Sequence, residues 1–167
     1  KRQLGSSFKP VVYTAAFQKG FTPDTILFDT LTNFSADGKT KYEPKNYNLK
    51  EYGPVSMRKA LAGSLNIPAV KTLYLTGLDS VIKLAQSLGY STISLKDKDN
   101  YGLTLALGTI EAPMIDHVQA FSVFANSGIK RNLKSILTVK DSAGKILEDN
   151  TEIDIGIRVI DKNIVNE

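Results

Sequence analysis

The sequence predicts a mainly α-helical fold with one β-hairpin. Apolar residues recur at helical spacing in about five segments, most of which are bounded by a capping residue or a glycine. The stretch "SILTVKDSAGKILE", near residues 135–148, instead combines a β-branched run, an Asp-Ser-Ala-Gly turn and a short return strand. A chain of 167 residues is long enough for one domain with a sizeable core.

The first expected helix covers residues 7–19, where apolar residues fall at helical spacing and Gly20 provides a C-terminal stop. Residues 21–54 are rich in turn-forming pairs such as Asp-Gly and Gly-Pro, with one short strand possible near Ile26–Phe28. We expect the aspartates of this segment to form turns. They are Asp24, Asp29 and Asp37.

Three helices are expected in the middle of the chain, each with its own start signal. Ser56 can cap the helix "MRKALAGS", and Pro68 can lie in the first turn of "PAVKTLYLT", which Gly77 closes. Asp79 or Ser80 can cap "VIKLAQSL", which the next glycine closes. Short helices with these caps indicate a body built by helix packing.

The last third of the chain begins with a polar loop, "STISLKDKDNYG". An amphipathic helix, "APMIDHVQAFSVFANSG", follows and ends at Gly128, before the hairpin. Asp161 can cap a helix that has only begun when the sequence stops. Because the start at Lys1 also has no disordered lead-in, we expect both ends to be cuts inside a larger protein.

Composition excludes several classes of protein. Apolar residues make up 42% of the chain, but no apolar run approaches 18 residues, so we expect no membrane span. No signal peptide is present, so any export address would lie outside this chain. The net charge of +4 has no long basic run, which favours a solvated mixed surface over nucleic-acid binding. Without cysteines, and with His117 as the single histidine, we expect neither a metal site nor a cofactor.

A Ser-x-x-Lys element near the N-terminus is the first candidate for chemistry. This spacing places a hydroxyl and an amine one helical turn apart on the same face. A lysine kept neutral by burial can accept the proton of the serine, which then becomes a nucleophile. Ser6 precedes Lys9 by three residues and shares its face, whereas Ser7 precedes it by two and points away. Ser6 is therefore the candidate nucleophile and Lys9 its base.

The bare spacing is not specific. Ser-x-x-Lys also begins at four other serines, which fit helix caps, a helix end and the hairpin turn. They are Ser56, Ser80, Ser127 and Ser142. Ser-x-Asn occurs once, at Ser64 and Asn66, and by itself is more typical of residues that cap helices.

Longer strings carry more information. "GSSFKP" and "ALAGSLNIPAVK" occur together with "FTPDT", "YEPKNY", "LALGTIEAPMIDHVQAFSVFANSG" and a hairpin, in that order. Over nearly its whole length the chain therefore resembles the transpeptidase domain of class A penicillin-binding proteins. The resemblance implies a serine acyltransferase that cross-links peptidoglycan stem peptides and is acylated by β-lactam antibiotics.

The resemblance also implies roles for four residues. Ser6 corresponds to the acylated serine and Lys9 to its general base. Ser64 corresponds to the hydroxyl that relays a proton between the lysine and the leaving group. Asn66 corresponds to the amide that holds the backbone of the substrate peptide. Tyrosines in the preceding segment either line a substrate groove or pin that segment to the core. They are Tyr42, Tyr47 and Tyr52.

The family's third motif, Lys-Thr-Gly or Lys-Ser-Gly, does not occur in the 167 residues. The resemblance therefore implies that residues 1–167 are a partial transpeptidase domain. That part is the helical lobe of the α/β serine D,D-transpeptidase or β-lactamase-like fold, with most of the central antiparallel sheet missing. We expect the apolar helix faces that would cover this sheet to be exposed. We also expect the chain alone to be impaired, and to need a companion segment that carries Lys-Thr-Gly.

Three functions remain open at this stage. The favoured one is a D,D-transpeptidase of a membrane-anchored penicillin-binding protein at the extracytoplasmic face of a bacterial cytoplasmic membrane. A D,D-carboxypeptidase, a β-lactamase or a β-lactam sensor could use the same serine and lysine. A non-catalytic scaffold domain in cell-wall synthesis is the third.

Overall fold

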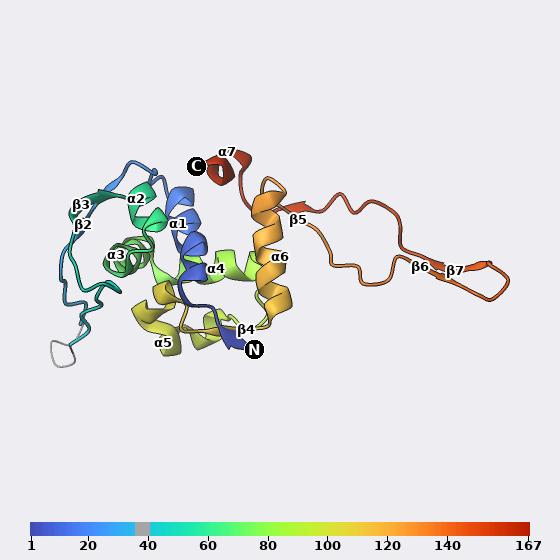
Figure 1. The fold of residues 1–167 in the computed structure, drawn as a ribbon, viewed down its shortest axis with the longest axis horizontal. Helices are drawn as coiled ribbons and strands as arrows, with labels where there is room; N and C mark the ends of the chain where they lie inside the picture. The colour runs from blue at the N-terminus through green and yellow to red at the C-terminus, as the bar shows by residue number, and fades with distance from the viewer. Residues whose placement is uncertain (36–40) are drawn as a thin grey trace.

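The helix α1, Lys9–Gln18, lies at the centre of the body (Figure 1) in a computed structural model that describes residues 1–35 and 41–167. Apolar residues occur on every side of this helix, and such a helix is stable only when neighbouring elements cover it. Val11, Val12 and Tyr13 are all fully buried. Helices α3 and α4 pack directly against α1.

Helices dominate the described residues. After α1 come α2, Met57–Ala62; α3, Asn66–Thr76; α4, Leu78–Leu88; α5, Lys98–Tyr101; α6, Met114–Ala125; and α7, Lys162–Asn166. Three 3-10 helices join them: η1, Gly5–Phe8; η2, Leu95–Asp97; and η3, Gly102–Leu107. Tightly packed apolar side chains from α1, α3, α4 and α6 form most of one core.

Strands in the described residues pair only two by two, and every pair is antiparallel. The pairs are β1, Arg2–Gln3, with β4, Glu111–Ala112; β2, Ile26–Asp29, with β3, Gly53–Ser56; β5, Ile129–Lys130, with β8, Ile157–Arg158; and β6, Thr138–Lys140, with β7, Ile146–Asp149. The β6–β7 hairpin projects far from the helical body (Figure 1). Its side chains therefore contribute little to the core.

Most of the expected elements are confirmed. The hairpin pairs Thr138 with Asp149, and its turn is held by the Asp141 carboxylate, which accepts from two backbone N–H groups. The Ser56 hydroxyl accepts from the N–H of Lys59 and so caps α2. Gly77 and the glycine after α4 end their helices as expected. Asp161 caps α7.

Three details of the predicted elements differ from the structure. The helix α4 begins at Leu78, so Asp79 and Ser80 lie inside its first turn and neither side chain caps it. The segment expected as a polar loop forms η2 and α5, which its run of consecutive charged residues, Lys96–Asp99, does not indicate. The first helix begins as the 3-10 turn η1 and becomes α-helical only at Lys9.

The three aspartates expected in turns have three different outcomes. Asp24 lies in the turn closed by the hydrogen bond from Thr25 N to Thr22 O. Asp37 lies outside the described residues. Asp29 is not a turn former, because it ends β2 with its side chain fully buried. The expectation for Asp29 was therefore wrong.

One face of α6 is apolar and uncovered. Met114 is 82% exposed and Val118 is 57% exposed, and Phe121 continues the same stripe two turns after Met114. On its opposite face, Ala120 and Val123 are buried in the core. The body thus presents an exposed apolar helix face. Across the described residues, no helix is both long enough and apolar enough to cross a membrane.

Candidate active site

The turn that carries Ser6 is fixed by the segment around β4. Strand β1 pairs with β4, and the ladder continues as Gly5 N donates to Gly108 O at 2.9 Å. Gly108 has φ of 65°, and a Cβ atom there would overlap the backbone of Gly5. Glycine is therefore required at position 108, because its missing side chain lets the two backbones meet. This contact places the η1 turn at the edge of the core.

Within η1 the two adjacent serines differ in their surroundings. Ser7 is occupied locally, since its hydroxyl donates to Leu4 O at 2.6 Å. Ser6 is exposed, and its hydroxyl makes no hydrogen bond to another described residue. Residues three apart in a 3-10 helix lie almost directly above one another, so Ser6 and Lys9 share one side of the turn. Both serines are exposed, and among the described residues only the Ser7 hydroxyl is engaged, so Ser6 is the better candidate.

The side chain of Lys9 crosses to the loop between α2 and α3. Its Nζ donates to Ser64 Oγ at 3.1 Å, to Ser64 O at 2.6 Å and to Asn66 Oδ1 at 2.8 Å. These three contacts use all three N–H donors of an ammonium group. Three of the four predicted site residues therefore meet in space, although 55 residues separate Lys9 from Ser64.

Burial gives Lys9 an unusual proton affinity. Only 1% of its surface is exposed, and none of its contacts within the described residues is with a carboxylate. Desolvation disfavours the charged amine and lowers the pKa of Lys9 from 10.5 to about 8. At pH 7 roughly a tenth of such lysines are neutral, which is enough to supply a base.

Ser64 is held in place by its backbone conformation, and Asn66 by a hydrogen bond of its side chain. Ser64 has φ of 50°, a left-handed conformation that serine rarely adopts, and this turns both its carbonyl and its hydroxyl oxygen toward Lys9. Asn66 is the first residue of α3, and its Nδ2 donates to Lys45 O at 2.8 Å. That bond fixes the orientation of the amide, so that Oδ1 faces the lysine.

The other four Ser-x-x-Lys elements have structural positions. Ser56 is an N-cap, Ser80 lies in the first turn of α4, Ser127 follows the end of α6, and Ser142 lies in the hairpin turn. Among the lysines that the structure describes, only Lys9 has its amine bound by the Ser-x-Asn element.

A groove opens beside Ser64. It has a volume of about 430 Å³ and is lined by Asn48, Tyr47, Tyr52 and Lys59 among others. Tyr47 is fully exposed at its rim. Tyr42 does not reach it, since its ring packs against Phe34 with centroids 6.3 Å apart. Tyr47 and Tyr52 thus lie at a groove, whereas Tyr42 packs on the protein.

His117 lies away from these residues. Its Nδ1 is 2.7 Å from the hydroxyl oxygen of Tyr90, and its ring packs against Phe121. In residues 1–35 and 41–167, no group of three or more histidine, cysteine, aspartate or glutamate side chains is arranged to hold a metal ion.

Sequence reasoning missed three residues that position this site. Gly108 supports the serine turn, and Asn46 and Asp29 lie behind the N-terminus of α3. One signal was available for Asn46. The residue that precedes α3 is Leu65, which has no polar side chain to satisfy the free N–H groups of the first turn, so a cap from elsewhere is required.

Comparison with known proteins identifies one matching family and several similar proteins. Residues 2–167 match the family described as "Penicillin binding protein transpeptidase domain". The chain is 39% identical over 152 residues to penicillin-binding protein 2D of Bacillus subtilis, covering 90% of this chain and 21% of that protein. It is 37% identical over 150 residues to penicillin-binding protein 1A of Aquifex aeolicus, covering 89% and 20%.

A solved structure shows the same fold. The crystal structure of penicillin-binding protein 1A from Haemophilus influenzae superposes with a TM-score of 0.84 at 26% identity, over 96% of this chain and 28% of that one. The chain thus spans about a fifth of the length of the curated relatives it matches.

The contact between Gly108 and Gly5 predicts an unusual sensitivity. Gly108→Ala should lower the free energy of unfolding by more than about 2 kcal/mol, because it combines a left-handed backbone with a direct overlap. Gly144→Ala is the matched control: its φ is 85°, but no atom lies within 4 Å of the added Cβ, so a loss of about 1 kcal/mol is expected. Denaturant unfolding measures both, and equal losses would show that the close approach is unimportant.

Proposed function

Because this chain belongs to the transpeptidase-domain family of penicillin-binding proteins, we propose that it forms the nucleophile side of a D,D-transpeptidase active site that cross-links peptidoglycan stem peptides. One observation supports this most directly. The amine of Lys9, one turn after an accessible serine, is held by the only Ser-x-Asn element in the sequence. We place this activity at the extracytoplasmic face of a bacterial cytoplasmic membrane, as a part of a larger, membrane-anchored protein.

The first chemical step in this proposal is attack by Ser6 Oγ on the carbonyl carbon of a stem-peptide amide. The serine proton passes to the neutral amine of Lys9, and the C–N bond then breaks as the leaving amine takes a proton through Ser64 Oγ. The products are an ester on Ser6 and a free amine. In the second step the amine of another stem peptide attacks that ester, and the same groups return the proton to Ser6.

The contacts of Lys9 support its assignment as the base. Carbonyl oxygens can only accept hydrogen bonds, so Ser64 O and Asn66 Oδ1 must each keep an N–H of the amine. A hydroxyl can either donate or accept. The lone pair of a neutral Lys9 can therefore face only a serine hydroxyl, either Ser64 Oγ or Ser6 Oγ. This restriction directs proton transfer to the two groups that need it.

We assign to Asn66 the role of orienting the substrate. Its Nδ2 uses one N–H on Lys45 O, which leaves a second N–H for a backbone carbonyl of a bound peptide. The groove beside Ser64, with Tyr47 and Tyr52 at its wall, could receive the rest of that peptide. β-Lactams enter this proposal as acylating agents of Ser6, in keeping with the family's name.

The proposal also requires a companion segment. Lys-Thr-Gly, which in this family binds the terminal carboxylate and helps to form the oxyanion hole, does not occur in the 167 residues. Removing one oxyanion donor from a serine hydrolase costs about 3–4 kcal/mol of transition-state stabilisation. We therefore assign slow acylation to the 167 residues alone and full activity to a protein that adds this motif.

Labelling with a fluorescent penicillin tests this assignment. Ser6 of the 167-residue chain should react at least about a hundredfold more slowly than Ser6 of a protein that also carries Lys-Thr-Gly. Gel fluorescence measures the rate, and mass spectrometry of the labelled peptide identifies the serine. Labelling at Ser7 or Ser56 would overturn the assignment of the nucleophile. Rapid labelling of the 167-residue chain alone would show that no companion segment is needed. Fast deacylation of the labelled protein would indicate a β-lactamase.

Lys9→Arg tests the base in the protein that carries the complete motif set. Arginine keeps its proton at all working pH values, so acylation should fall by at least about a hundredfold while the melting temperature changes little. Lys83→Arg is the matched control, because Lys83 follows Ser80 at the same spacing but lies on α4. Normal acylation of the Lys9→Arg variant would show that Lys9 is not the base.

The lowered pKa of Lys9 predicts the direction of the pH dependence. The base is active only when it has lost its proton, so the acylation rate should rise with pH and level off above about 8. An unperturbed lysine would still gain rate up to pH 10 or so. Stopped-flow acylation between pH 6 and 9.5 makes the comparison, and a rate that does not change over this range would contradict the assignment.

A further inference from the structure

The buried carboxylate of Asp29 has no role in the proposed chemistry. Asp29 lies at the end of β2 and has no exposed surface. An isolated buried charge is costly unless several hydrogen bonds satisfy it. Within the described residues Asp29 forms no ion pair, and its acceptors are used by the side-chain amide of Asn46 and by the N–H of Tyr52. Such a charge is retained where it holds something in place.

Asp29 holds the amide of Asn46. Asn46 Nδ2 lies 2.8 Å and 2.9 Å from the two carboxylate oxygens, and it also donates to Lys50 O at 2.8 Å. Asn46 is itself only 3% exposed. With its Nδ2 directed at the carboxylate, its Oδ1 must face the opposite way. The carboxylate therefore sets the orientation of the amide.

The free oxygen of Asn46 caps α3. Asn46 Oδ1 accepts from Asn66 N at 2.8 Å and from Ile67 N at 3.4 Å. Leu65, which precedes the helix, provides no side-chain cap of its own. A residue 20 positions earlier in the chain thus satisfies N–H groups that would otherwise be left without an acceptor at the start of the helix.

The capped residues are the same ones that hold Lys9. Asn66 uses its N–H on Asn46 and its Oδ1 on Lys9, and Ser64 lies two residues before it. A continuous chain of hydrogen bonds therefore runs from Asp29 through Asn46 and Asn66 to the amine of Lys9. Moving the start of α3 would move Asn66 Oδ1, one of the three acceptors of that amine, and would disturb Ser64, which provides the other two.

We propose that Asp29 and Asn46 are positioning residues for the acylation of Ser6, acting through the N-terminus of α3 on Lys9. The inference rests on the proposed function, because it assumes that Lys9 is the base. Asn46 does not touch the reacting atoms. It fixes where the acceptors of Lys9 stand, and a shift of those acceptors would open the buried amine to water. A displacement of about 1 Å in such a support can lower a rate by roughly a hundredfold.

Asn46→Ala in the protein that carries the complete motif set is the first test. The second-order rate of acylation by a fluorescent penicillin should fall roughly tenfold to a hundredfold. Water reaching the amine should also raise the pKa of Lys9 toward its ordinary value, so the limb of the pH–rate profile should move to higher pH. A loss of folded protein alone would lower the rate equally at every pH and would reduce the fraction that can be acylated.

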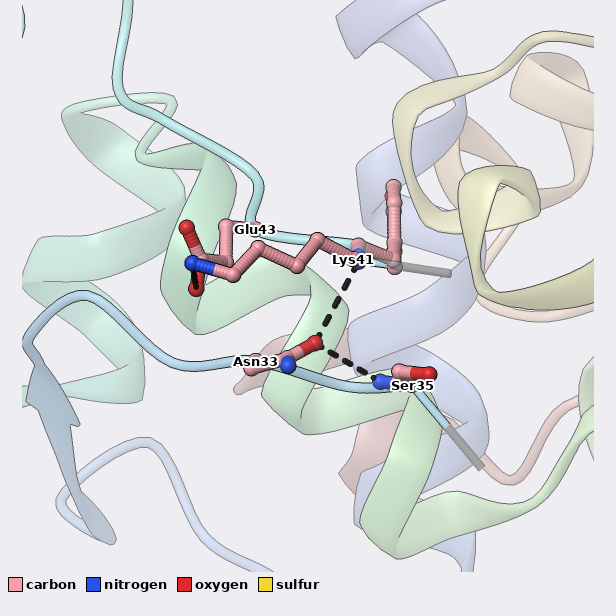
Figure 2. A network of polar contacts seen from close by, with 5 residues as sticks. Asn33, Ser35, Lys41 and Glu43 are labelled. Atoms are coloured by element: carbon pink, nitrogen blue, oxygen red, sulfur yellow. Dashed lines mark hydrogen bonds and ion pairs between the residues drawn. The ribbon is translucent and has the colours of Figure 1, made fainter. Parts of the chain in front are cut away.

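Asn33→Ala is the matched control. Its Oδ1 accepts from the backbone N–H of Ser35 at 3.0 Å (Figure 2) and from that of Tyr42 at 3.3 Å, in the same segment between β2 and β3. Like Asn46 Oδ1, Asn33 Oδ1 accepts from two backbone N–H groups, but neither donor belongs to α3. Asn33→Ala should acylate at the wild-type rate with an unshifted profile. Equal behaviour of the two variants would overturn the proposal.

A double variant that exchanges the residues at positions 29 and 46 separates a loss of positioning from a loss of folding. Asn46→Asp places two carboxylates against each other and should be the most impaired of the set. Adding Asp29→Asn restores one amide facing one carboxylate, with an acceptor still directed at Asn66 N, and should recover most of the rate. No recovery in a stably folded double variant would overturn the proposal. Failure of the wild type to acylate at Ser6 would instead refute the proposed function.

Discussion

The bond between the amine of Lys9 and the loop that carries Ser64 and Asn66 determines how the rest of the body is arranged. A lysine with almost no exposed surface needs acceptors for three N–H groups, and α1 provides none of them. The α2–α3 loop must therefore lie against the N-terminus of α1. All three acceptors are neutral. Hence they satisfy the amine without adding the charge that would hold its proton.

This choice of neutral acceptors distinguishes the site from a structural ion pair. A carboxylate beside Lys9 would stabilise the charged form and raise the pKa, whereas burial alone lowers it to about 8. The carboxylate closest along the hydrogen-bond chain, Asp29, is separated from the amine by the amides of Asn46 and Asn66. The two amides fix the position of the acceptors of Lys9 and separate the carboxylate from the amine.

Features encoded by neighbouring residues could be predicted from the sequence. The hairpin and the Ser56 cap depend on residues within a few positions of one another. Asp29 and Asn46 could not be interpreted in this way, because an aspartate or asparagine among turn residues has the same local pattern whether it forms a turn or supports a helix far along the chain. Short strand pairs such as β1–β4 were missed because two residues carry no alternating pattern.

The left-handed backbone at Ser64 limits which residues can replace it. Glycine would adopt φ of 50° at no steric cost, and asparagine tolerates it, whereas most other residues would add strain of about 1 kcal/mol or more. Glycine would, however, leave Lys9 without a hydroxyl partner, and asparagine would put a longer amide in its place. Serine satisfies the hydroxyl requirement while accepting the strain. Two independent requirements, the left-handed backbone and the hydroxyl partner of Lys9, thus oppose substitution at this position, so few residue types could replace Ser64.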